Sequence, residues 1–129
     1  MILVDTSAWI AFFRDRGRLA ERVAIAVSEG EAALCGPVLT ELVRGLRPPE
    51  RKRVLPLLEA LERLDAPPDL WLAAGELGYL LARKGRTAKS LDLLIATYAM
   101  HHGATVLTDD ADFSEMAAAG IPIAVDRGK

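Results

Sequence analysis

The amino-acid sequence predicts an α/β fold built on a mostly parallel sheet. Short apolar runs alternate with longer stretches of helical periodicity, and Gly or Pro breaks separate them. Strands that alternate with helices form right-handed crossover units, which cover both faces of a parallel sheet with helices. The chain has 129 residues, a usual size for one domain, so we expect residues 1–129 to form a single domain.

The first half of the chain predicts three strands and four helices. Gly36 and Pro37 open the helix that carries Glu41, and the break at Pro48 and Pro49 ends it, because proline cannot continue a helix. The expected elements in this half are a strand at Ile2–Val4, a helix around Ala8–Phe12, a helix from Gly17 to Ser28, a strand at Ala32–Cys35, the Glu41 helix, a helix to about Leu61 and a short strand near Leu64.

The second half predicts three helices and two strands. A helix should start at Pro67-Pro68 and run through Leu81, and an unusually apolar helix should span Ser90–His101 and close at Gly103. The remaining expected elements are a strand at Ala104–Leu107, a short helix after an acidic turn, and a strand at Ile121–Val125. Pro122 cannot donate to a ladder, so the last strand should lie at a sheet edge.

Composition supports a folded protein in a reducing compartment. Hydrophobic residues make up 51% of the chain and charged residues 26%, which is enough to build a packed core. The apolar start of the chain is interrupted by Asp5 and no basic residue precedes it, so we expect neither a signal peptide nor a membrane span, and a cytoplasmic location. Cys35 is the only cysteine and lies in an apolar run, which predicts a buried, inert thiol.

The net charge of −2 does not indicate nucleic-acid binding for the molecule as a whole. Basic residues nevertheless gather in two clusters, one of Arg44, Arg47, Arg51, Lys52 and Arg53, the other of Arg83, Lys84, Arg86 and Lys89. Such clusters are more often solvated faces than phosphate sites, so both interpretations stay open here.

Acidic residues follow the predicted strands at positions where ligands bind in this class of fold. Asp5 follows the first strand and Asp110 the fourth, so both carboxylates should emerge at the C-terminal edge of the sheet. If the two strands are neighbours, Asp5 and Asp110 face each other across a crevice. Glu41 lies on a helix that starts directly after the second strand, and therefore near the same edge.

Asp92 lies in the first turn of a helix that is apolar nearly all round and therefore buried. No Lys or Arg follows within that helix, so an ionised Asp92 needs another partner. Carboxylates brought together repel one another unless they are protonated or bind a cation. A set of oxygen ligands without histidine or cysteine suits Mg²⁺ or Mn²⁺.

Each acid taken singly also has a structural interpretation. Asp5 could cap the next helix, Asp92 could complement a helix N-terminus, and Asp109, Asp110 and Asp112 could be turn residues. The functional hypothesis rests on their joint arrival at one edge.

Histidines and aromatic residues are better explained by structure than by the metal site. His101 and His102 close the helix that Asp92 opens, about 14 Å away along its axis, and predict a C-terminal cap. The side chains of Trp9, Phe12, Phe13 and Trp71 have helical spacing that is typical of core or interface residues, with base stacking as the alternative.

Four motifs in order resemble the PIN-domain family, and particularly the VapC-type toxins. They are Val4–Ser7, Thr40–Gly45, Ser90–Ala96 and Leu107–Phe113. The resemblance covers nearly the whole chain. It implies a three-layer α/β/α fold with a five-stranded parallel sheet in the order 3-2-1-4-5.

The resemblance also implies a site, a reaction and partners. The metal ligands of the family fall on Asp5, Glu41, Asp92 and Asp110, with Asp112 as a frequent fifth acid, and nearby hydroxyl positions fall on Thr6, Ser7 and Thr108. The implied activity is Mg²⁺- or Mn²⁺-dependent endonucleolytic cleavage of RNA, by a homodimer that a VapB-like antitoxin inhibits. Arg44 could offset phosphate charge.

Two rival interpretations remain at this point. A haloacid-dehalogenase-like phosphatase also starts with an Asp after its first strand, but it needs another acid two residues on, where this chain has Ser7. A catalytically idle PIN-like module that only binds an antitoxin or RNA is the second, because a fold does not establish an activity. The RNA target and the number of metal ions are open.

Overall fold

Five strands and seven helices alternate along the chain in the computed structural model, which describes residues 1–129. In chain order they are β1 (Ile2–Val4), α1 (Thr6–Phe13), α2 (Gly17–Ser28), β2 (Ala32–Leu34), α3 (Gly36–Gly45), α4 (Pro48–Ala60), β3 (Glu62–Arg63), α5 (Leu70–Arg83), α6 (Ser90–His102), β4 (Thr105–Leu107), α7 (Ala111–Ala118) and β5 (Ala124–Asp126).

The strands form one parallel sheet in the order β3-β2-β1-β4-β5, which confirms the predicted class and topology. Leu3 of β1 lies opposite Ala33 of β2 on one side and Val106 of β4 on the other. The strand order therefore reverses between β1 and β4, and such a switch point opens a crevice at the C-terminal ends of the strands.

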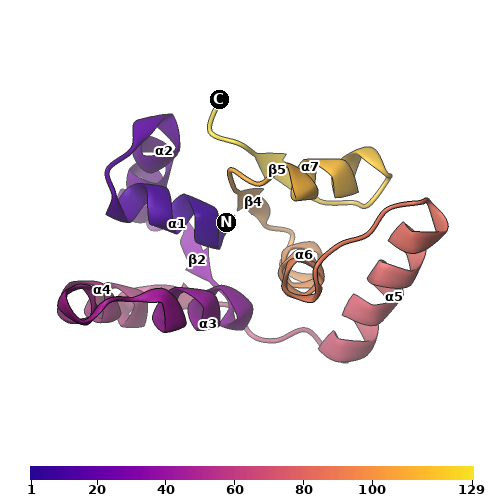
Figure 1. The fold of residues 1–129 in the computed structure, drawn as a ribbon, viewed down its shortest axis with the longest axis horizontal. Coiled ribbons are helices and arrows are strands. Elements are labelled where there is room, and N and C mark those ends of the chain that lie inside the picture. Colours follow the sequence, from indigo (N-terminus) through magenta and orange to yellow (C-terminus); the bar gives the residue numbers. More distant parts are fainter.

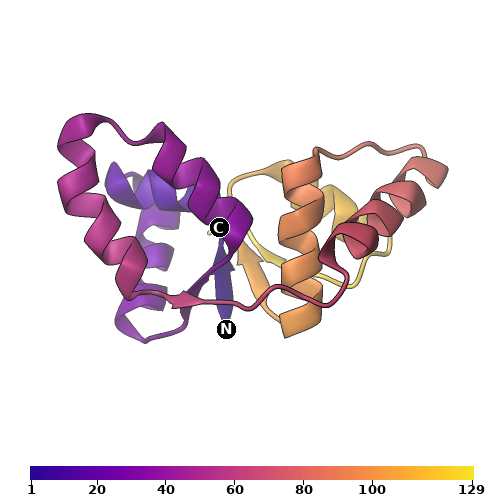
Figure 2. The ribbon, with the colours of Figure 1, turned by 90° about the horizontal axis from the view of Figure 1, so that it is seen from below.

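Helices cover the sheet on both sides. Figures 1 and 2 show α1 to α4 on one side of β1 and α5 to α7 on the other. The direction of the strand order explains this, because β1, β2 and β3 advance one way across the sheet while β4 and β5 advance the other way. Connections of the same right-handed sense then place the two groups of helices on opposite faces.

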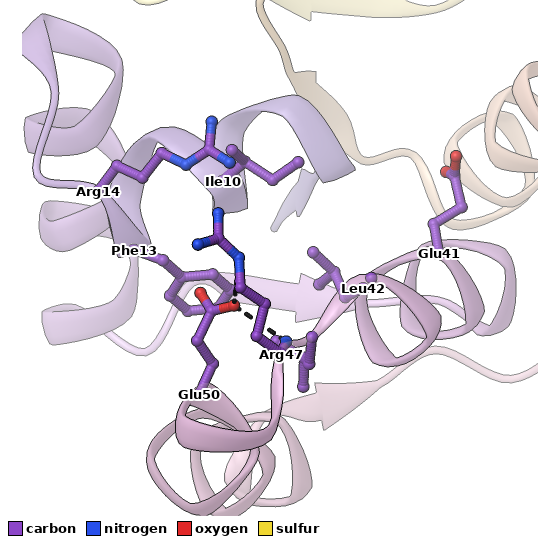
Figure 3. Close-up of a pocket in the computed structure, with 9 residues that line it drawn as sticks. Ile10, Phe13, Arg14, Glu41, Leu42, Arg47 and Glu50 are labelled. Atoms are coloured by element: carbon purple, nitrogen blue, oxygen red, sulfur yellow. Dashed lines mark hydrogen bonds and ion pairs between the residues drawn. The ribbon is translucent and has the colours of Figure 1, made fainter.

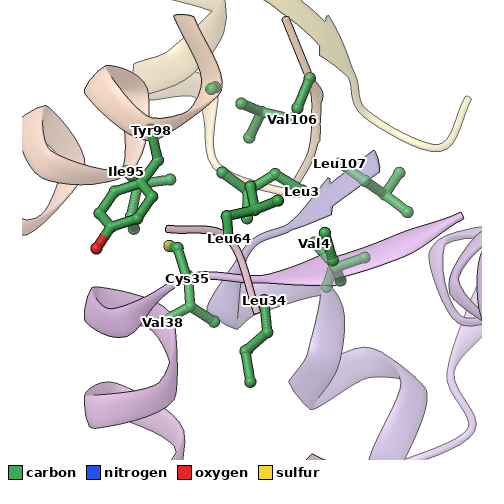
Figure 4. Close-up of a cluster of buried hydrophobic side chains, with 14 of the residues drawn as sticks. Leu3, Val4, Leu34, Cys35, Val38, Leu64, Ile95, Tyr98, Val106 and Leu107 are labelled. Atoms are coloured by element: carbon green, nitrogen blue, oxygen red, sulfur yellow. The ribbon is translucent and has the colours of Figure 1, made fainter. Parts of the chain in front are cut away.

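The core forms where the strands meet the helices on both faces (Figure 4). Leu3, Val4, Val106 and Leu107 are fully buried, as expected for central strands of a parallel sheet. Cys35 is a free, buried cysteine, and burial raises its pKa to about 12, which confirms the prediction of an inert thiol.

Several element boundaries differ from those predicted, and the largest differences concern β5, β3 and α5. β5 begins at Ala124, so Pro122 lies in the turn before the strand and not inside it. Residues Ile121–Ile123 form local hydrogen bonds instead of ladder bonds, with the Ile123 amide donating to the Ile121 carbonyl at 2.8 Å. β5 does lie at an edge of the sheet, but Pro122 is not the cause, because it lies outside the strand. β3 begins at Glu62 rather than near Leu64, and α5 begins at Leu70 after Asp69 adopts a positive φ of 50°.

The aromatic residues divide into two groups. Trp9 is fully buried and stacks on Phe13 at 5.9 Å between ring centroids, which confirms its place in the core. Trp71 is 77% exposed, so a core position for it was wrong. It lies on the outer face of α5, whose inner face buries Leu70, Leu77 and Leu81. None of the seven helices combines the length and apolar character that crossing a bilayer requires.

Candidate active site

The four predicted acids line one pocket at the C-terminal edge of the sheet. Asp5, Glu41, Asp92 and Asp110 share a pocket of about 470 Å³. They arrive from the end of β1, from α3, from the first turn of α6 and from the residue before α7. Figure 2 shows β1 pointing toward the end of the molecule where α6 begins, so strand ends and helix starts meet there.

Asp5 is held between β1 and β4 by its backbone and its side chain. The Asp5 amide donates to the Leu107 carbonyl at 2.9 Å, which extends the pairing with β4 one residue beyond the end of β1. Oδ2 of Asp5 accepts hydrogen bonds from Thr108 Oγ1 at 2.8 Å and Ser7 Oγ at 3.0 Å. Asp5 occupies the N-cap position of α1, but its side chain makes no capping hydrogen bond, so its interpretation as a side-chain cap is wrong.

The two hydroxyls also fix the acidic turn after β4. Thr108 Oγ1 accepts from the Asp110 amide at 2.9 Å, and Ser7 Oγ accepts from the Asp109 amide at 3.0 Å. A hydroxyl has one proton to donate, and each of these protons goes to Asp5. The turn is therefore tied to Asp5 through two hydroxyls, while Thr6 donates to Oε1 of Glu41 at 2.8 Å.

Three carboxylates come close enough to share a cation. Ligand oxygens of Asp92, Asp110 and Asp112 lie within 4.8 Å of one another. Oδ2 of Asp92 is buried and has no hydrogen-bond partner, which is costly for an ionised group unless a cation balances it. Asp110 Oδ1 accepts from the Asp112 amide at 2.9 Å and so caps α7, which confirms a structural role for this residue too. The donor set and the orphaned oxygen fit Mg²⁺ or Mn²⁺.

The electrostatics of the pocket favour protonation or a bound cation. Burial, as the largest cause, and the carboxylates of Asp110, Asp5 and Asp112 together raise the pKa of Asp92 to about 6, while Lys89 opposes them. Burial, with a smaller contribution from the Glu41 carboxylate, also raises the pKa of Asp5, against the lowering effect of the Thr108 and Ser7 hydroxyls and the Thr6 backbone amide. Carboxylates that repel one another thus lie close together in this pocket, and a divalent cation would relieve their repulsion.

Sequence comparison identifies the family. The model of the PIN domain matches residues 2–119. The chain belongs to the PIN-domain family. Ribonuclease VapC11 from Mycobacterium tuberculosis is 34% identical to it over 123 residues, which cover 91% of this chain and 92% of that protein. Ribonuclease VapC21 from the same organism is 34% identical over 120 residues, covering 90% and 86%.

Solved structures agree with this assignment. A DNA-bound VapBC complex from Salmonella typhimurium contains a chain that superposes on this PIN domain with a TM-score of 0.75 and 26% identity, covering 97% of this chain and 96% of that one. The family assignment sets aside the haloacid-dehalogenase alternative, which rested on the first Asp alone.

Other predicted residues occupy different places in this PIN domain. Arg44 is exposed in the last turn of α3 and does not line the acidic pocket. His102 Nε2 lies 2.8 Å from the Asp65 carbonyl at the far end of α6, and Gly103 closes that helix with φ 64°, so neither histidine joins the acids. Asp109 is exposed and stands outside the group of three carboxylates.

Lys89 is a pocket residue that the sequence reasoning did not single out. It precedes the first turn of α6 and lines the pocket beside Ser90 and Asp92. In the sequence it belongs to the basic cluster of Arg83, Lys84, Arg86 and Lys89. Its position directly before the Ser90–Ala96 motif was the available signal, because the N-terminus of that helix had already been placed at the site.

A smaller cavity adjoins the acidic pocket (Figure 3). Its volume is about 110 Å³, and it shares Ile10 and Glu41 with the acidic pocket. Arg14 at the end of α1 and Arg47 before α4 line it, and the Arg47 amide donates to Glu50 Oε1 at 3.0 Å. Basic side chains therefore lie next to the acids on this side.

Replacing Asp92 should stabilise the metal-free PIN domain. The pKa of Asp92 is about 6 in the folded state against 3.8 for an ordinary Asp, so the folded state binds the proton more tightly. This contribution favours folding at low pH and is lost as the pH rises through about 6, where ionised Asp92 becomes a cost. In EDTA at neutral pH, we expect Asp92→Asn to raise the free energy of unfolding by about 1–3 kcal/mol.

Urea unfolding measured from acid to neutral pH checks this. The difference between Asp92→Asn and wild type should shrink as the pH falls below 6, because Asp92 becomes protonated in the folded state, and it should vanish once the pH is well below the ordinary Asp pKa of 3.8 and both states are protonated. An Asp92→Asn protein that is less stable than wild type in EDTA at neutral pH would contradict the electrostatic account.

Thr108→Val should destabilise the fold more than the same change at Thr97. Thr108 is fully buried and its hydroxyl joins Asp5 to the Asp110 amide, so its loss leaves buried groups unpaired and costs about 1–3 kcal/mol. Thr97 is also buried, but its hydroxyl only donates to the Leu93 carbonyl of its own helix at 2.7 Å. Equal losses of unfolding free energy in the two variants would argue against a special role for Thr108.

Proposed function

We propose that this PIN domain is a metal-dependent endoribonuclease of the VapC type. The observation that carries the proposal is the meeting of Asp92, Asp110 and Asp112 in one PIN-domain pocket, with a buried Asp92 oxygen that no group of the protein satisfies. Relatives named ribonucleases, similar over nine-tenths of the chain, support RNA as the substrate.

Asp92, Asp110 and Asp112 would hold Mg²⁺, or Mn²⁺ in its place. When bound, such a cation supplies an activated water and stabilises charge on a phosphodiester during its displacement. Asp5 lines the same pocket and keeps Oδ1 free of side-chain hydrogen bonds, since Ser7 and Thr108 both donate to Oδ2. We therefore propose that Asp5 adds a ligand or orients water through Oδ1.

Glu41 and Lys89 would act from the walls of the pocket. Thr6 holds Oε1 of Glu41 at 2.8 Å, which leaves Oε2 to accept a proton or to orient water. The Lys89 ammonium would attract the phosphate without a bidentate geometry. Ser7 is committed to Asp5 and Asp109, so the protein offers no activated covalent nucleophile here.

The partners follow from the proposed activity and from the relatives. RNA is the substrate, and a VapB-like antitoxin is the proposed inhibitor, in line with the VapBC complex from Salmonella typhimurium. A cytoplasmic location, where RNA is accessible, belongs to the same proposal. An idle binding module would need no intact acid cluster, and the acids are all present in the pocket.

Cleavage of RNA should depend on metal and on the acid cluster. Purified protein, freed of antitoxin, is incubated with a mixed pool of structured RNA and Mg²⁺ or Mn²⁺, and products are mapped on sequencing gels. We expect cuts that disappear with EDTA and in Asp5→Asn and Asp92→Asn, because each removes a charge that holds the cation.

Glu59→Gln is the matched control for these variants. Glu59 is exposed on α4 and lines neither the acidic pocket nor the cavity beside it, so this variant should cleave as wild type does. RNA that remains intact with wild type under every metal condition would favour the idle binding module.

A homodimer, which the family resemblance implies, is also proposed. Four large apolar side chains are exposed on the outward half of α5, namely Trp71, Leu72, Tyr79 and Leu80. They recur at helical spacing around exposed Gly75, where a partner backbone could approach closely. Exposed apolar surface of this kind is costly unless a partner covers it.

Trp71→Glu should weaken the dimer, because it places a charge in the proposed interface. Sedimentation velocity should show a dimer for wild type and a monomer for Trp71→Glu at the same protein concentration. Ile25→Glu is the control, since Ile25 is an exposed apolar residue on α2, and this variant should stay dimeric. A dimeric Trp71→Glu protein would place the interface elsewhere.

A further inference from the structure

A basic groove lies next to the acidic pocket on the side of α1 and α2. Its volume is about 520 Å³, and five cations line it, namely Arg14, Arg16, Arg18, Arg127 and Lys129. The only acid in its lining is Asp109, and only three of its twelve lining residues are hydrophobic. The groove therefore carries a strong local positive charge on a protein whose net charge is −2.

The cations of the groove are not engaged by acids of the protein. The ion pairs of the structure are Arg22 with Asp126 and Arg47 with Glu50, so none of the five takes part in one. Arg127 donates from Nη2 to the Asp109 carbonyl at 2.7 Å, but its Nε is buried without any partner. Guanidinium donors left free beside one another are suited to phosphate oxygens.

The residues after β5 are fixed in place although they add little to the core. Arg22 Nη2 donates to Asp126 Oδ2 at 2.8 Å, and the Gly128 amide donates to Asp126 Oδ1 at 2.8 Å. Gly128 has φ +75°, and a Cβ there would lie 3.2 Å from the Leu19 Cα of α2. Figure 1 shows the chain leaving β5 for the side of the molecule that holds α2. These contacts position Arg127 and Lys129 in the groove in advance of any ligand.

The groove continues into the acidic pocket. Ser7 and Ile10 line both, and Asp109 of the groove is adjacent in sequence to Asp110 of the pocket. A strand whose scissile phosphate lay at the acids would therefore have its next phosphates over the arginines. Phosphates repeat along a nucleic acid and match a row of cations, and unpaired strands are bound by such charged grooves.

We propose that this groove binds the phosphodiester backbone of single-stranded RNA on one side of the bond to be cleaved. The proposal rests on the proposed ribonuclease function and adds the path of the substrate across the surface. It assigns backbone binding to Arg14, Arg16, Arg18, Arg127 and Lys129, none of which belongs to the two basic clusters of the sequence.

Binding can be tested apart from cleavage. The Asp92→Asn protein in EDTA is titrated into a fluorescein-labelled single-stranded RNA oligonucleotide, and anisotropy is followed at several salt concentrations. In this background we compare the triple variant Arg14→Gln, Arg16→Gln, Arg18→Gln with the triple variant Arg51→Gln, Lys52→Gln, Arg53→Gln. Both remove three charges, but the second set is exposed on α4 outside the groove.

The groove variant should bind RNA at least ~10-fold more weakly at about 0.1 M salt. The negative slope of log K against log salt should become smaller in magnitude by roughly 2. The α4 variant should stay within about two-fold of its parent, because salt screens charges that do not contact the strand. Circular dichroism and thermal melting should show both variants folded, since all six side chains are exposed.

Gly128→Ala tests the pre-positioning without changing any charge. The added Cβ meets Leu19 and should displace Arg127 and Lys129, which weakens RNA binding. Gly85→Ala is the control, because Gly85 has a similar φ of +76° and open space around it. Its RNA binding should match that of the parent.

Several outcomes would overturn the inference. If both triple variants bound RNA equally weakly, RNA would respond only to the overall positive charge and not to the groove. If the groove variant bound RNA as its parent does, RNA would bind elsewhere. If the groove variant lost more affinity for a glutamate oligomer than for RNA, the groove would be assigned to an acidic protein segment. If wild type cleaves RNA while the groove variant binds normally, this inference fails and the proposed function stands. Binding through the groove without any cleavage by wild type would leave the inference standing and remove the nuclease.

Discussion

The hydrogen bond from Thr108 to Asp5 joins the two halves of the sheet at the point on which the site depends. β1 leads into helices on one face of the sheet and β4 into a helix on the other face, and their pairing ends at the hydrogen bond from the Asp5 amide to the Leu107 carbonyl. Beyond that point, the Thr108 side chain links the two strand ends by donating to Asp5, and it also accepts from the Asp110 amide of the acidic turn. The position of Asp110 and Asp112 relative to Asp92 therefore follows from one buried hydroxyl and its neighbour Ser7.

The site pairs local instability with function. The carboxylates of Asp5, Asp92, Asp110 and Asp112 raise one another's free energy, and burial adds to this effect at Asp92. An apolar or amide side chain would fit the start of α6 at lower cost. The cost is explained if a bound cation relieves the repulsion among the carboxylates. The free energy released in this way would then add to the affinity of the site for the cation.

Sequence patterns predict the fold and the acidic residues of the site better than they predict the basic groove and the outer surface. Asp5, Asp92 and Asp110 could be placed at one edge because each follows a strand or opens a helix, and such ends converge in a parallel sheet. The contacts of Ser7 and Thr108 could not be derived, since they depend on side-chain orientation across 101 or more residues. The groove combines the loop after α1 with residues after β5, and Trp71 shows that an apolar helical pattern does not tell which face is covered.

The spread of the acids along the chain also bears on how the protein is made. Asp5 emerges from the ribosome early, but its partner Thr108 lies 103 residues later, and Asp110 later still. Contacts at such separation form late and slowly compared with local helices. A nascent chain on the ribosome would hold its acids apart until nearly all of the domain has been translated. The proposed nuclease would thus be harmless during its own synthesis, beside the very RNA from which it is read.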